Sequence, residues 1–243
     1  MMDTTTLLLI LVLTIAASFI QRVSGFGFGI FVMMFFPFFL PSYGESITLS
    51  GLLAGTTALL IAIRNFKHIR WSIMWTIVLF NVIASYIAIE YMASVSNESL
   101  KRWLGVMLVV IALYFMFFDG KVKMIFRSRL SQAIVGAVSG CMGGMFAMPG
   151  PPVVLYSITV INDKREYIAT LQAFSVIFNI FYTIFRANVG FFSESTTLYW
   201  AVGLLGLVAG AWLGSRCFEY ISSSLLKKIV YIMMMISGIA AIF

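Results

Sequence analysis

Six uncharged, strongly apolar stretches constrain the fold of this chain more than any other feature of its sequence. A helix of about 20 residues crosses the hydrocarbon core of a bilayer, and each stretch is within reach of one crossing. The stretches are residues 47–63, 71–89, 103–118, 167–185, 197–215 and 229–243. Of the 243 residues, 61% are hydrophobic and only 10% are charged, too few charges to coat a water-soluble protein of this length. The sequence therefore predicts an all-α, polytopic membrane protein.

Two further apolar regions, residues 7–40 and 130–161, are too long for a single crossing. As straight helices each would measure about 50 Å, whereas the hydrocarbon core is about 30 Å thick. Both regions are interrupted by helix-breaking residues, the first at 24–29 and the second at 139–144 and again at 149–152. We expect each region to form a broken helical hairpin.

Basic residues in the loops predict the orientation of the segments. The net charge of +7 does not indicate nucleic-acid binding, because the basic residues flank hydrophobic segments instead of forming a stripe on a soluble fold. The positive-inside rule places loops 64–70 and 121–129 on the cytoplasmic side. If the second hairpin returns to the side that it left, the basic residues of 164–165 and 216–228 also lie inside, and only Arg186 lies in an outside loop. We therefore expect a multi-pass protein of the cell (inner) membrane with both termini outside.

The two parts of the chain also resemble each other in sequence. Three short matches occur in the same order: Val23-Ser24-Gly25 recurs as Val138-Ser139-Gly140, Glu45 as Glu166, and Leu100-Lys101-Arg102 as Leu226-Lys227-Lys228. Each half then contains one hairpin and three crossings, and an odd number of crossings inverts the second copy relative to the first. We predict two inverted repeats, residues 1–120 and 130–243.

The breaks in the two hairpins predict a binding site for an anion. Non-helical backbone at membrane depth is tolerated only where it is buried in protein or lines a wet cavity, and the N–H groups of half-helix N-termini attract anions. The candidate residues at the breaks are small or are helix breakers: Ser24, Gly25, Gly27, Gly29, Ser139, Gly140, Gly143, Gly144 and Pro149. The alternative is that these glycines only allow helices to pack closely, which is common in membranes.

Arg22 is the charged candidate for this site, because it adjoins the first break at the end of an otherwise uncharged run. A buried guanidinium would offer several planar donors to an oxyanion. The alternatives are that Arg22 reaches the membrane interface or pairs with a backbone carbonyl. Gln172 and Asn179 are seven residues apart and so share one helix face, where they either line the cavity or bond between helices.

Other functional classes find little support in the sequence. All nine acidic residues fall in loops or near segment ends, so no intramembrane group for a coupling proton or sodium ion is evident. The single histidine, His68, lies in a basic loop, and no nucleophile with a base and no metal-ligand set is recognisable. We expect neither an enzyme nor a cofactor. An anion channel of similar architecture stays an alternative, although it needs a continuous polar pore.

At these residues the chain resembles the sulfite exporter TauE/SafE family of transporters. The resemblance covers nearly the whole length and includes the stretch Ser24-Gly25-Phe26-Gly27-Phe28-Gly29 and its Gly-rich, Pro-containing counterpart in the second half. It implies transport of a small sulfur-containing anion such as sulfite, thiosulfate or the organosulfonate sulfoacetate. Alternating access around a site between the hairpin tips at the membrane midplane would move that anion. An inside-negative potential favours export over an uptake permease, and the oligomeric state is left open between a monomer and a homodimer.

Overall fold

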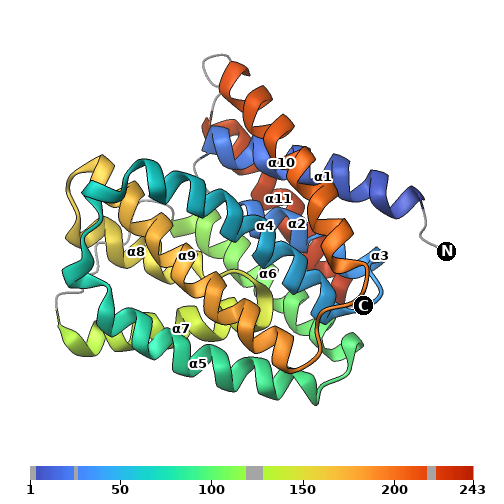
Figure 1. The fold of residues 1–243 in the computed structure, drawn as a ribbon, viewed down its shortest axis with the longest axis horizontal. Helices are drawn as coiled ribbons and strands as arrows, with labels where there is room; N and C mark the ends of the chain where they lie inside the picture. The colour runs from blue at the N-terminus through green and yellow to red at the C-terminus, as the bar shows by residue number, and fades with distance from the viewer. Residues whose placement is uncertain (1–3, 25–26, 119–127, 218–222, 243) are drawn as a thin grey trace. The chain divides into compact units, whose positions relative to one another are not determined.

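A computed structural model describes residues 4–24, 27–118, 128–217 and 223–242, and helices are the only regular secondary structure in those ranges (Figure 1). Six of these helices are long and apolar enough to cross a membrane: α1 (Thr4–Ser24), α4 (Tyr43–Arg64), α5 (Trp75–Ala93), α6 (Asn97–Phe118), α9 (Lys164–Asn188) and α10 (Thr196–Cys217). The remaining elements are α2 (Phe28–Met33), α3 (Phe36–Phe39), α7 (Arg129–Phe146), α8 (Gly150–Val160), α11 (Ser223–Ile242) and the 3₁₀ helices η1 (Phe66–His68) and η2 (Trp71–Ile73). The predicted all-α polytopic membrane protein is confirmed.

Several helices extend beyond the uncharged stretches that predicted them. Helix α6 begins at Asn97, so its first turns carry Glu98 and Arg102, which form an i,i+4 ion pair of 2.8 Å. Helix α9 continues to Asn188 and includes Arg186, so the prediction that Arg186 lies in a loop is wrong. Charged side chains are compatible with these helix ends because they find a partner there or reach water.

Of the two breaks predicted in the second hairpin, at 139–144 and at 149–152, only one near the second is observed. Helix α7 passes without interruption through Ser139–Gly144, so the predicted break at those residues is wrong. The helix ends where Ala147 adopts the left-handed conformation with φ 56°, and the Met148 N–H bonds the Met142 carbonyl at 3.3 Å. This is a helix C-cap of the kind that satisfies the last carbonyls. The break therefore consists of residues 147–149.

After this break the chain turns back along itself. The Gln132 side chain donates to the Tyr156 hydroxyl at 2.8 Å, and the Ser139 hydroxyl donates to the Pro149 carbonyl at 2.6 Å. Both bonds join α7 to the segment that follows it, one far from the turn and one close to it. Helices α7 and α8 are therefore antiparallel, and the region is a broken helical hairpin as predicted.

In the first hairpin α1 is followed by two short helices, α2 and α3. Gly27 precedes α2 with φ 102°, a conformation that glycine adopts without steric cost and other residues rarely adopt. Pro37 lies in the first turn of α3, where its missing N–H is not needed. Gly27 therefore contributes to the interruption between α1 and α2, while Gly25 and Phe26 lie outside the described residues.

The chain divides into two compact units, and each takes segments from both predicted repeats. Unit 1 comprises residues 1–53, 96–121 and 192–243, and unit 2 comprises residues 54–95 and 122–191. Unit 1 therefore contains α1, α2, α3, α6, α10 and α11 with the first part of α4, and unit 2 contains α5, α7, α8 and α9 with the rest of α4.

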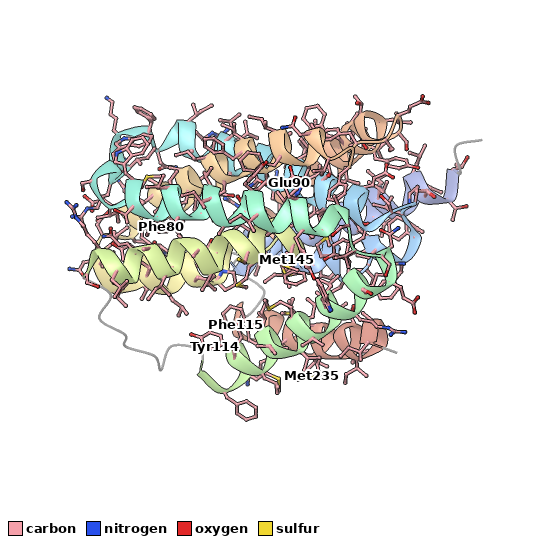
Figure 2. All side chains as sticks on the ribbon, turned by 90° about the horizontal axis from the view of Figure 1, so that it is seen from below. Phe80, Glu90, Tyr114, Phe115, Met145 and Met235 are labelled. Atoms are coloured by element: carbon pink, nitrogen blue, oxygen red, sulfur yellow. The ribbon has the colours of Figure 1, made fainter. Side chains whose placement is uncertain are left out.

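Within unit 2 the closest helix pair is α5 with α7, which lie side by side in both views (Figures 1 and 2). Gly136, Gly140 and Gly144 recur every four residues along the contact. A Cβ at Gly136 would overlap the Ile77 carbonyl, and one at Gly140 would overlap the Asn81 carbonyl. Small residues at this spacing let two helix backbones approach closely in a membrane. Because the paired positions advance together along both helices, α5 and α7 are parallel.

Unit 1 contains a matching parallel pair, α1 with α10. Here the close-packed glycines are Gly206, Gly210 and Gly214 of α10, each of which lies against main-chain atoms of α1. The Ser18 hydroxyl of α1 donates to the Leu207 carbonyl at 2.7 Å and holds the two helices together. Each unit therefore contains a parallel helix pair that packs closely through glycines spaced four residues apart.

Candidate functional site

A buried polar network lies beside the hairpin break in unit 2. The Tyr182 hydroxyl of α9 donates to the Asn81 side-chain oxygen of α5 at 3.0 Å, and the Asn81 amide donates to the Ser139 hydroxyl of α7 at 3.3 Å. Ser139 in turn donates to the Pro149 carbonyl at the break. Buried polar groups are costly unless they are bonded, so this chain of bonds fixes three helices around the hairpin tip.

Arg186 brings a positive charge to the same place. Its side chain is only 1% exposed, and a guanidinium nitrogen donates to the carbonyls of Gly143 at 2.7 Å and Gly144 at 3.3 Å. Its guanidinium carbon also lies 5.4 Å from the centre of the Tyr182 ring, in a cation–π contact. The bonded carbonyls belong to the C-terminal end of α7, where the helix dipole favours a cation. The partial charge of a helix end is about half an elementary charge, so it balances only part of the arginine charge.

The hairpin tip offers fewer backbone donors than the sequence suggested. Helix α8 begins at Gly150 and continues with Pro151 and Pro152, which have no N–H group. Two of the first four residues therefore cannot donate to a ligand. At this hairpin tip the polar donors are chiefly side chains, namely those of Arg186 and the network around it.

A buried carboxylate occupies unit 1. Glu45, in the first turn of α4, is 1% exposed, and one of its oxygens accepts hydrogen bonds from the hydroxyls of Ser193, Ser195 and Thr196. The three donors lie at the start of α10 or just before it. The sequence placed Glu45 correctly near a segment end but not in the interior. Two helix N-termini surround this carboxylate, and their dipoles favour its negative charge.

A comparison with protein families identifies the family of the chain. A model described as Sulfite exporter TauE/SafE matches residues 9–241 of the chain. The chain belongs to the sulfite exporter TauE/SafE family. Members of that family are membrane transporters, so this multi-pass membrane protein is a transporter and not an enzyme. Comparisons with curated proteins and with solved structures gave no match.

In this TauE/SafE transporter, the candidates from the first hairpin do not form a buried charged site. Arg22 ends α1 and is exposed, so the expectation of a buried guanidinium there is wrong. Its Nε donates to the Ser215 hydroxyl of α10 at 2.9 Å, and its aliphatic stem packs against Gly214. Gly27 and Gly29 are half-buried. Gly25 and the side chain of Ser24 lie outside the described part of the chain.

The candidates from the second hairpin divide into two groups. Gly140 and Gly144 face α5 and are required for helix packing, whereas Gly143 faces the Tyr182 ring. Ser139 and Pro149 belong to the buried network. The structure thus gives two of these glycines the packing role that the sequence left open.

Of the two amide residues on α9, Asn179 is buried and Gln172 is half-buried. The Asn179 amide donates within its own helix to the Ser175 carbonyl at 2.8 Å, and its Cβ lies against Gly55. Neither residue belongs to the network around Arg186.

Tyr182 and Arg186 were not among the candidates predicted from the sequence, although the sequence contains a signal for them. Asn179, Tyr182 and Arg186 are spaced by three and four residues, which places them on one face of a helix. The predicted span stopped at residue 185, one residue before the arginine. Extending the helix by one turn would have added the charge to the polar face.

Proposed function

We propose that this transporter exports a small sulfur-containing oxyanion and that Arg186 is its charged ligand. The observation that carries the proposal is a guanidinium buried in unit 2, next to the hairpin break and among the hydroxyl and amide donors of Tyr182, Ser139 and Asn81. Planar guanidinium groups bind oxyanions through two parallel hydrogen bonds. Sulfite, thiosulfate and organosulfonates such as sulfoacetate all present oxygens suited to this geometry.

Burying the positive charge of Arg186 costs free energy. An arginine in the interior of a membrane protein is expensive and usually marks a substrate or ion pathway. The carbonyls of Gly143 and Gly144 carry only partial negative charge, whereas an oxyanion carries a full one. An anion that replaced these carbonyls as the partner of Arg186 would therefore balance its charge more completely.

Alternating access between inverted repeats is the mechanism that we propose for transport. Two facts support it: α7 and α8 form a broken hairpin, and the close helix pairs α1–α10 and α5–α7 recur in the two units. In the predicted repeats 1–120 and 130–243, each pair joins the first helix of one repeat to the second crossing of the other, which is α5 or α10. A duplicated sequence predicts this repetition. The substrate would bind near the hairpin tips and be exposed to each side in turn.

We also propose the direction of transport and the orientation of the protein in the membrane. Because α5 and α7 are parallel, their first residues, Trp75 and Arg129, begin on one side, as the positive-inside rule expects from the basic residues that precede both helices in the sequence. We place that side in the cytoplasm and both termini outside. An inside-negative potential then drives a monoanion outward by about 2.3 kcal/mol per 100 mV.

Flux of radiolabelled sulfite, thiosulfate and sulfoacetate into proteoliposomes tests the proposal. We expect saturable flux of at least one anion in the wild type, its loss in Arg186→Gln, and partial activity in Arg186→Lys, which keeps the charge but not the planar donors. Arg22→Ala is the matched control because Arg22 is exposed at a helix end, and it should retain flux.

Each variant must first be shown to be folded and monodisperse in detergent. Normal flux in folded Arg186→Gln would refute the proposal that Arg186 binds the anion. Loss of flux in Arg22→Ala alone would indicate that the charged ligand lies in the first hairpin. Flux that rises linearly with concentration without saturation would indicate a channel.

A further inference from the structure

An open groove of about 540 Å³ lies on unit 2 between the first two turns of α5 and the first two turns of α7. Its walls come from both helices: Trp75, Thr76, Leu79, Phe80, Arg129, Leu130 and Ala133. Figure 2 shows Phe80 on α5 alongside α7, and the groove follows this seam. It is separate from the network around Arg186, none of whose residues line it.

The walls of the groove suit an acyl chain. Leu79 is 57% exposed and Leu130 is 71% exposed, and the apolar surface continues along both helices with Ile83 and Ile134. In a membrane-spanning helix pair, such large apolar side chains face lipid. The groove is therefore a depression in the lipid-facing surface and not part of the protein interior.

One charged residue, Arg129, lies at the end of this apolar surface. It occupies the first position of α7, where the positive end of the helix dipole makes a cation unfavourable for the helix itself. Its placement is therefore not explained by helix stability. Three more basic residues, Lys121, Lys123 and Arg127, precede it in the sequence.

Aromatic residues mark the same level of the membrane. Trp75 of the groove is 62% exposed and stacks on Trp71 with ring centres 6.3 Å apart, and Phe66 contacts Trp71 in turn. Exposed tryptophans of this kind lie at the headgroup level of a bilayer. The guanidinium at the start of α7 thus lies beside side chains that mark the level of the phosphates, while the apolar walls extend toward the acyl chains.

We propose that this groove binds one anionic phospholipid, with its phosphate at Arg129 and one acyl chain between α5 and α7. Charge complementarity selects the headgroup, because a basic side chain at the start of a membrane helix attracts anionic lipids. An apolar protein helix would fill the walls but would leave the arginine without an anion. A zwitterionic lipid would fill the walls equally well and would gain less from the charge.

Native mass spectrometry of the purified, full-length protein tests the proposal, with phosphatidylglycerol and phosphatidylcholine as probes. We expect the wild type to retain one phosphatidylglycerol at concentrations at which phosphatidylcholine is released. Arg129→Ala should weaken phosphatidylglycerol binding about fivefold, the effect of one basic residue near the membrane surface. Arg64→Ala is the matched control, because it removes an exposed arginine on the same predicted side but outside the groove.

A second variant separates the groove from the charge. Ala133→Leu adds volume between the walls and keeps Arg129, so it should lower the retention of phosphatidylglycerol in protein that stays monodisperse. Equal binding by the wild type and Arg129→Ala, or equal losses in Arg129→Ala and Arg64→Ala, would overturn the proposal. A dimer that Ala133→Leu converts to a monomer would overturn it as well, since a second copy would then cover the groove.

Discussion

Replacing Gly140 by alanine should force α5 and α7 apart and destabilise unit 2. A methyl group at this position would overlap the main-chain carbonyl of Asn81 and come within 3.0 Å of the Ala84 side chain. A main-chain carbonyl in a helix cannot rotate away from the new atom as the end of a flexible side chain can. The two helices must therefore move, and the neighbouring contacts at Gly136 and Gly144 weaken with them.

Two opposing effects set the size of the change. Overpacking a close contact costs about 1–3 kcal/mol, and a clash with the backbone belongs at the upper end of that range. Alanine is a better helix former than glycine by about 1 kcal/mol, which offsets part of the cost. The net destabilisation is about 2 kcal/mol, and for a chain of this length it lowers the melting temperature by about 4–8 °C.

Thermal unfolding of the purified protein in detergent, followed by intrinsic tryptophan fluorescence, measures this change. Gly150→Ala is the matched control, because no atom lies within 4 Å of a Cβ at that position and alanine is the better helix former, so it should melt no lower than the wild type. If Gly140→Ala also melts with the wild type, close helix packing is not the role of this glycine. A wild-type melting temperature combined with a raised KM for sulfite would instead support the ligand role that the sequence suggested.

Two further changes test the contacts of individual side chains. Tyr182→Phe leaves the buried Asn81 side-chain oxygen without its donor and should lower the free energy of unfolding by about 1–3 kcal/mol. The control Tyr86→Phe, at an exposed position of α5, should not change the melting temperature. Equal melting temperatures of the two variants would contradict the network. The Asp163 carboxylate caps α9, and the hydrogen bond from the Glu166 N–H is the main reason why its pKa lies below the ordinary value of 3.8. The ionised cap therefore stabilises the fold above pH 3.8. This stabilisation is lost as the pH falls through the lowered pKa of the folded state. Asp163→Ala should therefore melt earlier near neutral pH, and the difference from the wild type should shrink below pH 3.8; a constant difference would contradict the cap.

The apolar stretches predicted the fold class and five of the six membrane-length helices (α4, α5, α6, α9 and α10), because hydrophobicity and length alone decide whether a helix can span a bilayer. The sixth, α1, had been assigned to the first hairpin, and the predicted span 229–243 is a shorter apolar helix. The position of the second break was harder to predict, since glycine is a weak helix former in water. In α7, Gly136, Gly140 and Gly144 each contact another backbone, and this packing retains the helix through residues that would end it in a soluble protein.

The candidate site was only partly predictable for a similar reason. Ser139 and Pro149 were identified from the break itself, and both belong to the buried network. Arg186 was missed because a charge at the end of an apolar stretch normally indicates a loop. Only the three-dimensional contact with the α7 carbonyls shows that this arginine lies in the interior. Arg22 was predicted to be buried because it adjoins a break, but it is exposed, so a charge near a break is not necessarily buried.

The pairing of α1 with α10 has a consequence for how the protein is made. The Ser18 hydroxyl and its acceptor, the Leu207 carbonyl, are 189 residues apart in the sequence. At a synthesis rate of about 5–20 residues per second, the ribosome needs about 10–40 s to deliver the partner helix after α1 has entered the membrane. During that time the face of α1 that α10 will cover contacts lipid or the insertion machinery. Unit 1 therefore cannot complete its folding before α10 has been synthesised, and a ribosome that stalls before α10 leaves α1 without its partner in the bilayer.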